Sequence, residues 1–245
     1  MISTSDVHIG GTSTDPAVRA SAVIRGEADR LLQAYRAKAA LVTELRLESA
    51  LREEAHAGLA DFVIGHVRPY LDGTDRVLYA TAAGAPGTRL LVRALRGLRE
   101  SLAWHIDELV AASTPDQAAH AAHAVGIVLA ACVEVDGTVL LPALAELPGA
   151  DLPGLATDLR VLLDGGDLDT PDVLDVRPVP HGQRHPRIFG RYARLAPGES
   201  FVLVNNHDPK PLRREFTAAH PGLFTWDYLR QGPEVWKVRI GRIAD

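Results

Sequence analysis

The chain has little cysteine and no excess of positive charge, and each shortage excludes a class of protein. One Cys among 245 residues rules out a disulfide bond within the chain. Acidic residues outnumber Lys and Arg by 31 to 26, giving a formal net charge of −5. Proteins that bind nucleic acid need a basic surface, so we expect no nucleic-acid partner.

Long hydrophobic runs are also missing. Residues 1–8 lack the basic start and apolar run of a signal peptide, and no stretch has the roughly 18 uninterrupted apolar residues of a typical membrane span. We therefore expect a soluble, cytoplasmic protein with no membrane partner. Hydrophobic residues still make up 47% of the chain, which is enough for a substantial core.

The composition changes partway along the chain. Its first part is rich in Ala, Leu, Arg and Glu, which favour helix, whereas its last part is rich in Val, Phe, Trp and Pro-punctuated short runs, which favour strands. We therefore predict a two-domain protein that is α plus α/β. Its parts are a disordered N-terminus (1–14), a helical domain (15–147), a linker (148–172) and a small α/β domain (173–245). Within the linker, apolar spacing predicts a short helix from Leu155 to Leu163.

Four helices are expected in the first domain. Asp15-Pro16 is a helix cap followed by Pro at the first helical position. The second helix is expected to run to about Leu71 and to break at Asp72-Gly73. The third spans about Pro86 to Ala112, and the fourth follows the stop and cap at Ser113 to Asp116. Four long helices with short connections predict an antiparallel four-helix bundle.

The stretch from Gly65 to Tyr79 resembles a phrase of the hemerythrin-like (HHE cation-binding) family, Pro-His-x-x-x-Glu-(Asp/Glu)-x-x-Leu-Tyr. The residues that fit it are Pro69, Asp75, Leu78 and Tyr79. Tyr70, however, stands at the position of the metal-binding His, and Thr74 at that of the Glu. The resemblance thus implies the fold but not the ligands.

Two further segments resemble the same family. Leu91 to Leu95 looks like the start of its third helix, with Arg99 at the position of a ligand His. The segment from Ala131 to Leu144 resembles the ending His-x-x-x-Glu…Leu-Leu-Pro-Ala-Leu, with Cys132 for the His and Asp136 for the Glu. Because only one carboxylate of the family's ligand set remains, no metal site is expected by the family motif, and a di-iron centre is not expected.

The residues at the ligand positions of the family are expected to share the bundle core with His56 and His66. At about 100° per residue, His56 and His66 lie within about 40° of the direction of Tyr70. The histidines expected to point outward or sideways are His105, His120 and His123. The candidate binding residues are His66, Tyr70, Arg99, Cys132 and Asp136.

A buried arginine needs a compensating charge. Asp136 can provide it in an ion pair that leaves the core without a ligand. The carboxylate of a bound small molecule or of a haem propionate can also provide it. Since Cys, His and Tyr serve as axial haem ligands, haem and a single iron ion are the candidate cofactors.

The last part of the chain has the order βαβαββ. It resembles a small domain of unknown function that is often fused to hemerythrin-like bundles and is related to sulfur-carrier proteins of the two-layer α/β type. The motifs are Leu174 to Pro178, Arg184-His185-Pro186, Asn205-x-His207-Asp208-Pro209 and Gly232-Pro233-x-Val235-Trp236. Sulfur carriers need a Cys after the first strand, and none follows Cys132, so sulfur transfer is not expected.

His185 and His207 are the candidate site residues of this domain because they lie where strands pass into helices. The alternative is that they cap helices and bond to local turns. Two functions stay open for the whole chain. In one, the bundle core binds a small anionic molecule or a redox cofactor such as haem, and the protein acts in oxidative metabolism as an enzyme or sensor. In the other, the bundle binds no ligand and serves the C-terminal domain as a scaffold or by forming a homodimer.

Overall fold

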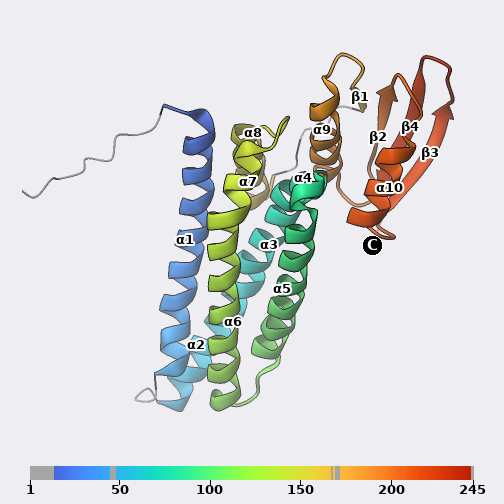
Figure 1. Cartoon of the computed structure of the whole chain (residues 1–245). Helices are drawn as coiled ribbons and strands as arrows, with labels where there is room; N and C mark the ends of the chain where they lie inside the picture. The colour runs from blue at the N-terminus through green and yellow to red at the C-terminus, as the bar shows by residue number, and fades with distance from the viewer. Residues whose placement is uncertain (1–13, 45–47, 167, 169–171, 244–245) are drawn as a thin grey trace, which may run out of the picture.

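The structure, a computed structural model, describes residues 14–44, 48–166, 168 and 172–243. It contains a mostly helical region followed by a small mixed sheet with helices (Figure 1). Residues 1–13 of the N-terminal stretch expected to be disordered lie outside the described residues. The coarse division into a helical part and an α/β part is confirmed.

The helical region begins with α1 (Pro16–Thr43). The predicted cap is confirmed, since the Asp15 side chain accepts a hydrogen bond from the backbone N–H of Ala17 at 2.8 Å. The chain then forms one continuous helical run with two π-helical turns, labelled η. Its segments are α2 (Ser49–Phe62), η1 (Val63–Val67), α3 (Arg68–Thr74), η2 (Asp75–Tyr79) and α4 (Ala80–Ala83).

The helix break expected at Asp72-Gly73 is wrong, because the helix continues through both residues. Gly73 instead packs against α8 (Leu152–Leu163), where an added Cβ would lie 3.2 Å from Cδ1 of Leu159. A glycine inside a helix costs about 1 kcal/mol relative to Ala. Gly73 does not turn the chain here. It allows α3 and α8 to approach each other closely.

Two more long helical stretches complete the region. They are α5 (Pro86–Ala111) and the continuous run α6 (Pro115–Val135), η3 (Asp136–Leu140) and α7 (Leu141–Glu146). Helix α6 packs against both α1 and α5. Within the described chain, Pro115–Glu146 is the one stretch that could cross a membrane by length and composition, a test that a core helix also passes.

The short helix expected within the linker is confirmed as α8, which begins at Leu152 rather than Leu155. Its residues Leu152, Leu155 and Leu159 are buried, and the helix packs against α1 and α3. Part of the stretch predicted as a linker therefore contributes to the core of the helical region.

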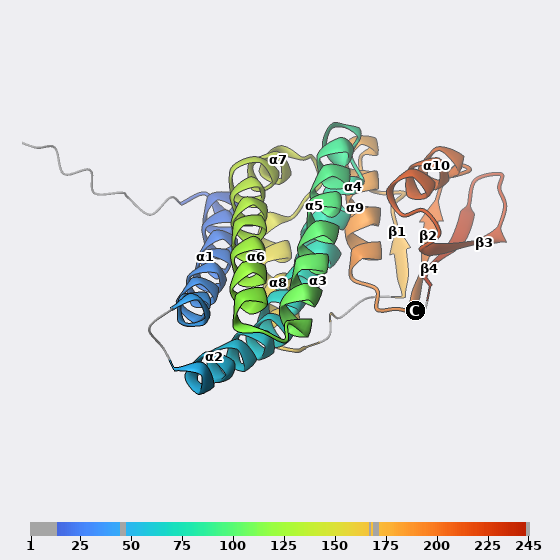
Figure 2. The same cartoon turned by 90° about the horizontal axis from the view of Figure 1, so that it is seen from below.

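The order βαβαββ is also confirmed. The elements are β1 (Val173–Asp175), α9 (His181–Ala193), β2 (Ser200–Asn205), α10 (Lys210–Ala219), β3 (Phe224–Arg230) and β4 (Trp236–Arg242). The sheet has the order β1-β2-β4-β3, with β1 parallel to β2 and the other neighbours antiparallel. Helix α9 lies between this sheet and the helical region (Figure 2).

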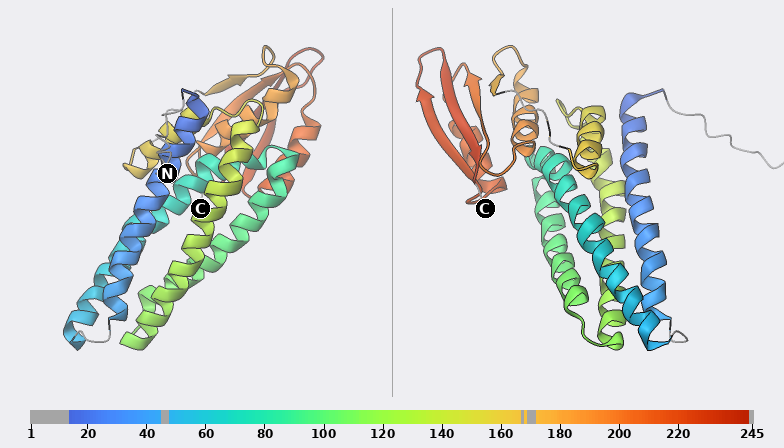
Figure 3. Two further views of the ribbon diagram at one scale, coloured as in Figure 1. Left: turned by 60° about the vertical axis from the view of Figure 1, so that its left-hand side comes forward. Right: turned by 180° about the vertical axis from the view of Figure 1, so that it is seen from behind.

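The two parts share one buried apolar cluster, which runs from Leu78 through Phe189 to Ile240. Helix α9 packs against α4, and Phe189 lies so close to Gly84 that an added Cβ would be 2.7 Å from its ring. Phe189 also stacks on Phe216 of α10, with ring centroids 4.3 Å apart. The C-terminal domain thus docks at the end of the helices opposite the α5–α6 connection (Figure 3).

We expect Gly84→Ala to lower the free energy of unfolding by about 1–3 kcal/mol, because the new methyl group collides with the ring of Phe189. The backbone of Gly84 has φ −69°, which any residue adopts, so the effect is steric. Gly58→Ala is the matched control, since no atom lies within 4 Å of its added Cβ. Denaturant unfolding measures both variants, and equal stability would contradict the close packing.

Candidate functional site

Arg99 lies on the buried face of α5. Leu95, Leu102 and Ile106 recur around it at helical spacing and are fully or almost fully buried. Its own side chain is 8% exposed. The apolar pattern of the helix therefore forces the guanidinium group into the interior.

Inside the protein, Arg99 is bound by three groups. Its Nη2 donates to Oδ2 of Asp136 at 2.9 Å, and its Nη1 donates to the carbonyl oxygen of Leu71 at 2.8 Å. The guanidinium carbon lies 3.8 Å from the ring centroid of Tyr79, a cation–π contact. The Tyr79 hydroxyl in turn donates to Oδ1 of Asp136 at 2.6 Å. We call Arg99, Asp136, Tyr79 and the Leu71 carbonyl the core network.

The core network is closed apart from one atom, Nε of Arg99, which is buried and has no hydrogen-bond partner among the described residues. Burial raises the pKa of the Asp136 carboxyl, while Arg99 and the hydrogen bond from Tyr79 act against this shift. Burial also opposes the charge on Arg99, yet its pKa is raised because neighbouring groups, Asp136 among them, favour the cation. We infer an ionised pair in which each charge requires the other.

Tyr70, Tyr79 and Cys132 add no charge to this network. Burial raises the pKa of the Tyr70 and Tyr79 hydroxyls, and it raises the pKa of the Cys132 thiol to about 11. All three groups are therefore protonated at neutral pH, and a protonated thiol is a poor nucleophile and metal ligand. The Thr74 hydroxyl donates to the carbonyl oxygen of Tyr70 at 2.8 Å, within its own helix.

Four of the five predicted core residues are buried together, namely Tyr70, Arg99, Cys132 and Asp136. The expectation that His66 faces the interior is wrong. Val63 and Val67, both fully buried, define the inner face of this turn, and His66 is exposed beside it. Its ring stacks on Phe62 with centroids 4.8 Å apart.

The remaining histidines of the helical region do not reach the core network. His56 is half-buried, with its Nε2 2.7 Å from the carbonyl oxygen of Leu109. His120 and His123 are exposed, as expected. His105 is half-buried and lies beside Glu108, with 3.3 Å between its Nδ1 and Oε2 of Glu108.

Tyr79 is the member of the core network that the sequence pattern did not reveal. On a regular α-helix it would point about 180° away from Tyr70, which lies nine residues earlier. The intervening chain contains the π-helical turn η2, which changes that angle. Helical spacing alone therefore could not place Tyr79 in the core.

The residues present do not fit a di-iron centre. The guanidinium of Arg99 lies among the buried residues that were expected at the ligand positions, and its charge would repel a metal cation. Within the described ranges, no group of three or more His, Cys, Asp and Glu side chains is placed to hold a metal ion. Of the two cavities that adjoin the core network, the one lined in part by Tyr70 and Asp136 measures 220 Å³. That volume is below the roughly 300–1,000 Å³ of small-molecule and cofactor sites, so haem does not fit it.

In the C-terminal domain, each of the two candidate histidines contacts a polar side chain. Nδ1 of His185 lies 3.0 Å from Oε2 of Glu215 on α10. His207 is exposed, its Nδ1 lies 2.8 Å from Oδ1 of Asn206, and its ring stacks on His181 with centroids 5.4 Å apart. The contact of His207 with its neighbour Asn206 agrees with the alternative of local bonding. His185 instead lies inside α9 and contacts a different helix, so it neither caps a helix nor bonds to a local turn.

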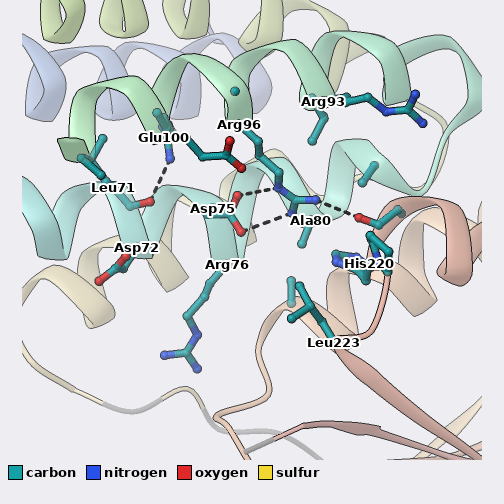
Figure 4. Close-up of a pocket in the computed structure, with 18 of the residues that line it drawn as sticks. Leu71, Asp72, Asp75, Arg76, Ala80, Arg93, Arg96, Glu100, His220 and Leu223 are labelled. Atoms are coloured by element: carbon teal, nitrogen blue, oxygen red, sulfur yellow. Dashed lines mark hydrogen bonds and ion pairs between the residues drawn. The ribbon is translucent and has the colours of Figure 1, made fainter. Parts of the chain in front are cut away.

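The structure reveals a further feature that the sequence pattern missed, a cavity of 940 Å³ that we call the junction cavity (Figure 4). Helices α3 and α5 with η2 form one side, and the ends of α9, α10 and β4 form the other. His220 lines it, is 4% exposed, and its Nε2 has no hydrogen-bond partner within the described part of the chain. Burial lowers the pKa of His220 to about 3, and Arg96 adds to this shift.

Comparison with known families identifies only the last part of the chain. Residues 173–242 match a family described as an uncharacterized conserved protein, DUF2249. No curated protein and no solved structure matches the chain. The resemblance of the C-terminal domain to a domain of unknown function is thus supported, whereas no comparison supports the hemerythrin resemblance of the helical region.

We expect Arg99→Ala to lower the free energy of unfolding by about 3–5 kcal/mol, because it leaves Asp136 buried without a counter-charge. Arg99→Met combined with Asp136→Asn should recover most of the loss, since no charge is stranded and the new amide oxygen still accepts from Tyr79. Urea unfolding, monitored by circular dichroism, measures the free energy of unfolding of each variant. Arg93→Ala, on the exposed face of the same helix, is the control. An Arg99→Ala effect no larger than the control would contradict the network.

We also expect His220 to make stability depend on pH. Its pKa is about 3 in the folded state but about 6.5 when unfolded, so below pH 6.5 the unfolded chain binds a proton that the folded chain excludes. Stability should fall by up to about 1.4 kcal/mol per pH unit between these values, or about 2 kcal/mol from pH 6.5 to pH 5. His220→Gln should remove this part of the loss, and His120→Gln should not. Identical pH profiles for both variants would overturn the assignment.

Proposed function

We propose that the helical region is a hemerythrin-like four-helix bundle that has lost its metal site and serves as a rigid scaffold for the C-terminal domain. The four helices of the proposed bundle are α1, the run from Ser49 to Ala83, α5, and the run from Pro115 to Glu146. The family-like phrases around Tyr79 and Leu141 support this fold. The core network supports the loss of the metal site, because a cation of the protein occupies its place.

The observation that carries the scaffold function is the buried apolar cluster shared by both parts. Domains joined by small polar interfaces usually move relative to one another, whereas a large hydrophobic interface prevents such motion. Here α9 contributes the fully buried Phe189 to the shared cluster and lies against α4.

Polar contacts across the junction support the same proposal. Arg96 donates from Nη1 to the carbonyl oxygen of Ala219 at 3.0 Å, and Arg76 donates from Nη2 to that of Arg194 at 3.1 Å. Arg194 also forms an ion pair of 2.6 Å with Asp158 of α8. These contacts favour one orientation of the C-terminal domain on the helices, as the proposal requires.

The alternative is that the core binds haem or a small anion and that the protein acts in oxidative metabolism as an enzyme or sensor. The geometry of the core supports this alternative less well than it supports the scaffold. Arg99, the group expected to bind such an anion, already donates to Asp136 and Leu71, and the cavity beside Tyr70 and Asp136 has only 220 Å³. Arg99 also lines the larger junction cavity, but its two Nη atoms are already bonded to Asp136 and Leu71. An anion entering the core would have to break the ion pair first.

A scaffold should transmit loss of stability to the domain that it supports. In a Trp104→Phe background, fluorescence of Trp226 and Trp236 reports the C-terminal domain, while circular dichroism reports mainly the helices. We expect both signals to share one unfolding midpoint. Leu129→Ala, a fully buried position on α6, should lower both midpoints by the equivalent of about 2–5 kcal/mol.

Ile127→Ala is the matched control, because Ile127 lies on the same helix and is 57% exposed. If Leu129→Ala lowers the circular-dichroism midpoint while the fluorescence midpoint stays unchanged, the helical region does not support the C-terminal domain and the proposal fails.

A further inference from the structure

The junction cavity has an excess of positive charge. Seven arginines and four carboxylate residues line it. The protein as a whole is acidic, with a formal net charge of −5, so this concentration of arginine runs against the overall composition. A concave site lined by one sign of charge attracts ligands of the opposite sign.

Several of these arginines form ion pairs with carboxylates, but Arg242 does not, and the carboxylate that interacts with it electrostatically, Asp72, lines the same cavity. Arg96, for example, binds Asp75 through Nε at 2.8 Å, and Arg68 pairs with Asp107. Arg242, at the end of β4, donates from Nη1 to the carbonyl oxygen of Leu195 at 3.3 Å. It forms no ion pair with any described residue, so its charge is available to a ligand.

His220 is the second residue whose environment indicates a bound ligand. It is 4% exposed, and its Nε2 lacks a hydrogen-bond partner within the described ranges. A buried polar nitrogen left unpaired is unfavourable, which suggests that a bound molecule completes its hydrogen bonding. Figure 4 shows His220 and Leu223 on the C-terminal side of the cavity, facing Asp75 and Arg96 on the helical side.

Apolar side chains lie beside these two groups. Ala80, Tyr192 and Leu223 line the same cavity. The Tyr192 hydroxyl is already used, since it donates to the carbonyl oxygen of Leu223 at 2.7 Å, which leaves its ring as an apolar surface. The site therefore combines a cation, an unpaired imidazole and an apolar wall.

We propose that the junction cavity binds a small organic anion, with its oxyanion group held by Arg242 beside His220 and its apolar part against Ala80, Tyr192 and Leu223. Guanidinium groups match the two-oxygen geometry of carboxylate and phosphate. The cavity volume of 940 Å³ lies within the roughly 300–1,000 Å³ of small-molecule sites. Because both parts of the chain form the cavity, the ligand contacts both of them.

The test uses the full chain and the fluorescent probe 8-anilinonaphthalene-1-sulfonate, which carries an oxyanion on aromatic rings. We expect saturable binding at one site per chain. Arg242→Gln should weaken it by about tenfold or more, because a hydrogen bond between charged groups is lost. Arg230→Gln, which removes the same charge from exposed β3 outside the cavity, should leave the affinity unchanged.

His220→Gln provides a second variant in case Arg242→Gln does not fold, and it should also weaken probe binding. Competition then identifies the oxyanion: displacement by benzoate indicates a carboxylate ligand, and displacement by inorganic phosphate indicates a phosphate ligand. Absence of saturable binding, displacement by neither competitor, or equal affinity in Arg242→Gln and Arg230→Gln would overturn the proposal.

Discussion

A buried guanidinium group needs its counter-charge within hydrogen-bond reach, and the interior of this protein is arranged around that requirement at Arg99. The cation, its carboxylate and the tyrosine that bridges them come from three separate helical stretches. Their distances hold only if α5, the run ending at Ala83 and the run beginning at Pro115 keep one relative register. A buried ion pair contributes little net stability, but removing one partner is strongly unfavourable, so packing arrangements that separate Arg99 from Asp136 are disfavoured.

The helical run that contains Tyr79 also contacts the C-terminal domain, so the core network and the domain interface lie on one continuous helix. Tyr79 ends the π-helical turn η2, and the helix continues for one more turn to Gly84, where Phe189 docks. Arg99 and Leu71, which belong to the core network, also line the junction cavity. These two residues of the network therefore form part of the wall of the junction cavity, in which the proposed anion site lies.

Much of the fold could be predicted from local patterns. Composition separated the helical part from the α/β part, Asp15-Pro16 marked the first helix, and apolar spacing located α8. The family-like phrases placed Tyr70, Arg99, Cys132 and Asp136 in the core. These predictions succeeded because they depend on neighbours in sequence or on one helix face.

The features that could not be predicted depend on contacts between distant segments. Gly73 looked like a helix stop because the partner that it accommodates, Leu159, lies far along the chain. Tyr79 was missed because a π-helical turn changes the angle between side chains. The docking of Phe189 on Gly84 left no local signal, since Gly84 precedes a Pro-containing turn and reads as ordinary loop.

We propose that the core network stands where a metal site would lie and holds its charges together without a ligand. A crystal structure of the full chain, expressed with added iron and haem precursor, tests it most directly. We expect electron density in which Arg99 contacts Asp136 directly and Tyr79 bonds to the same carboxylate, with no other group between them. Density for a metal ion, a haem or another bound molecule separating Arg99 from Asp136 would contradict the claim.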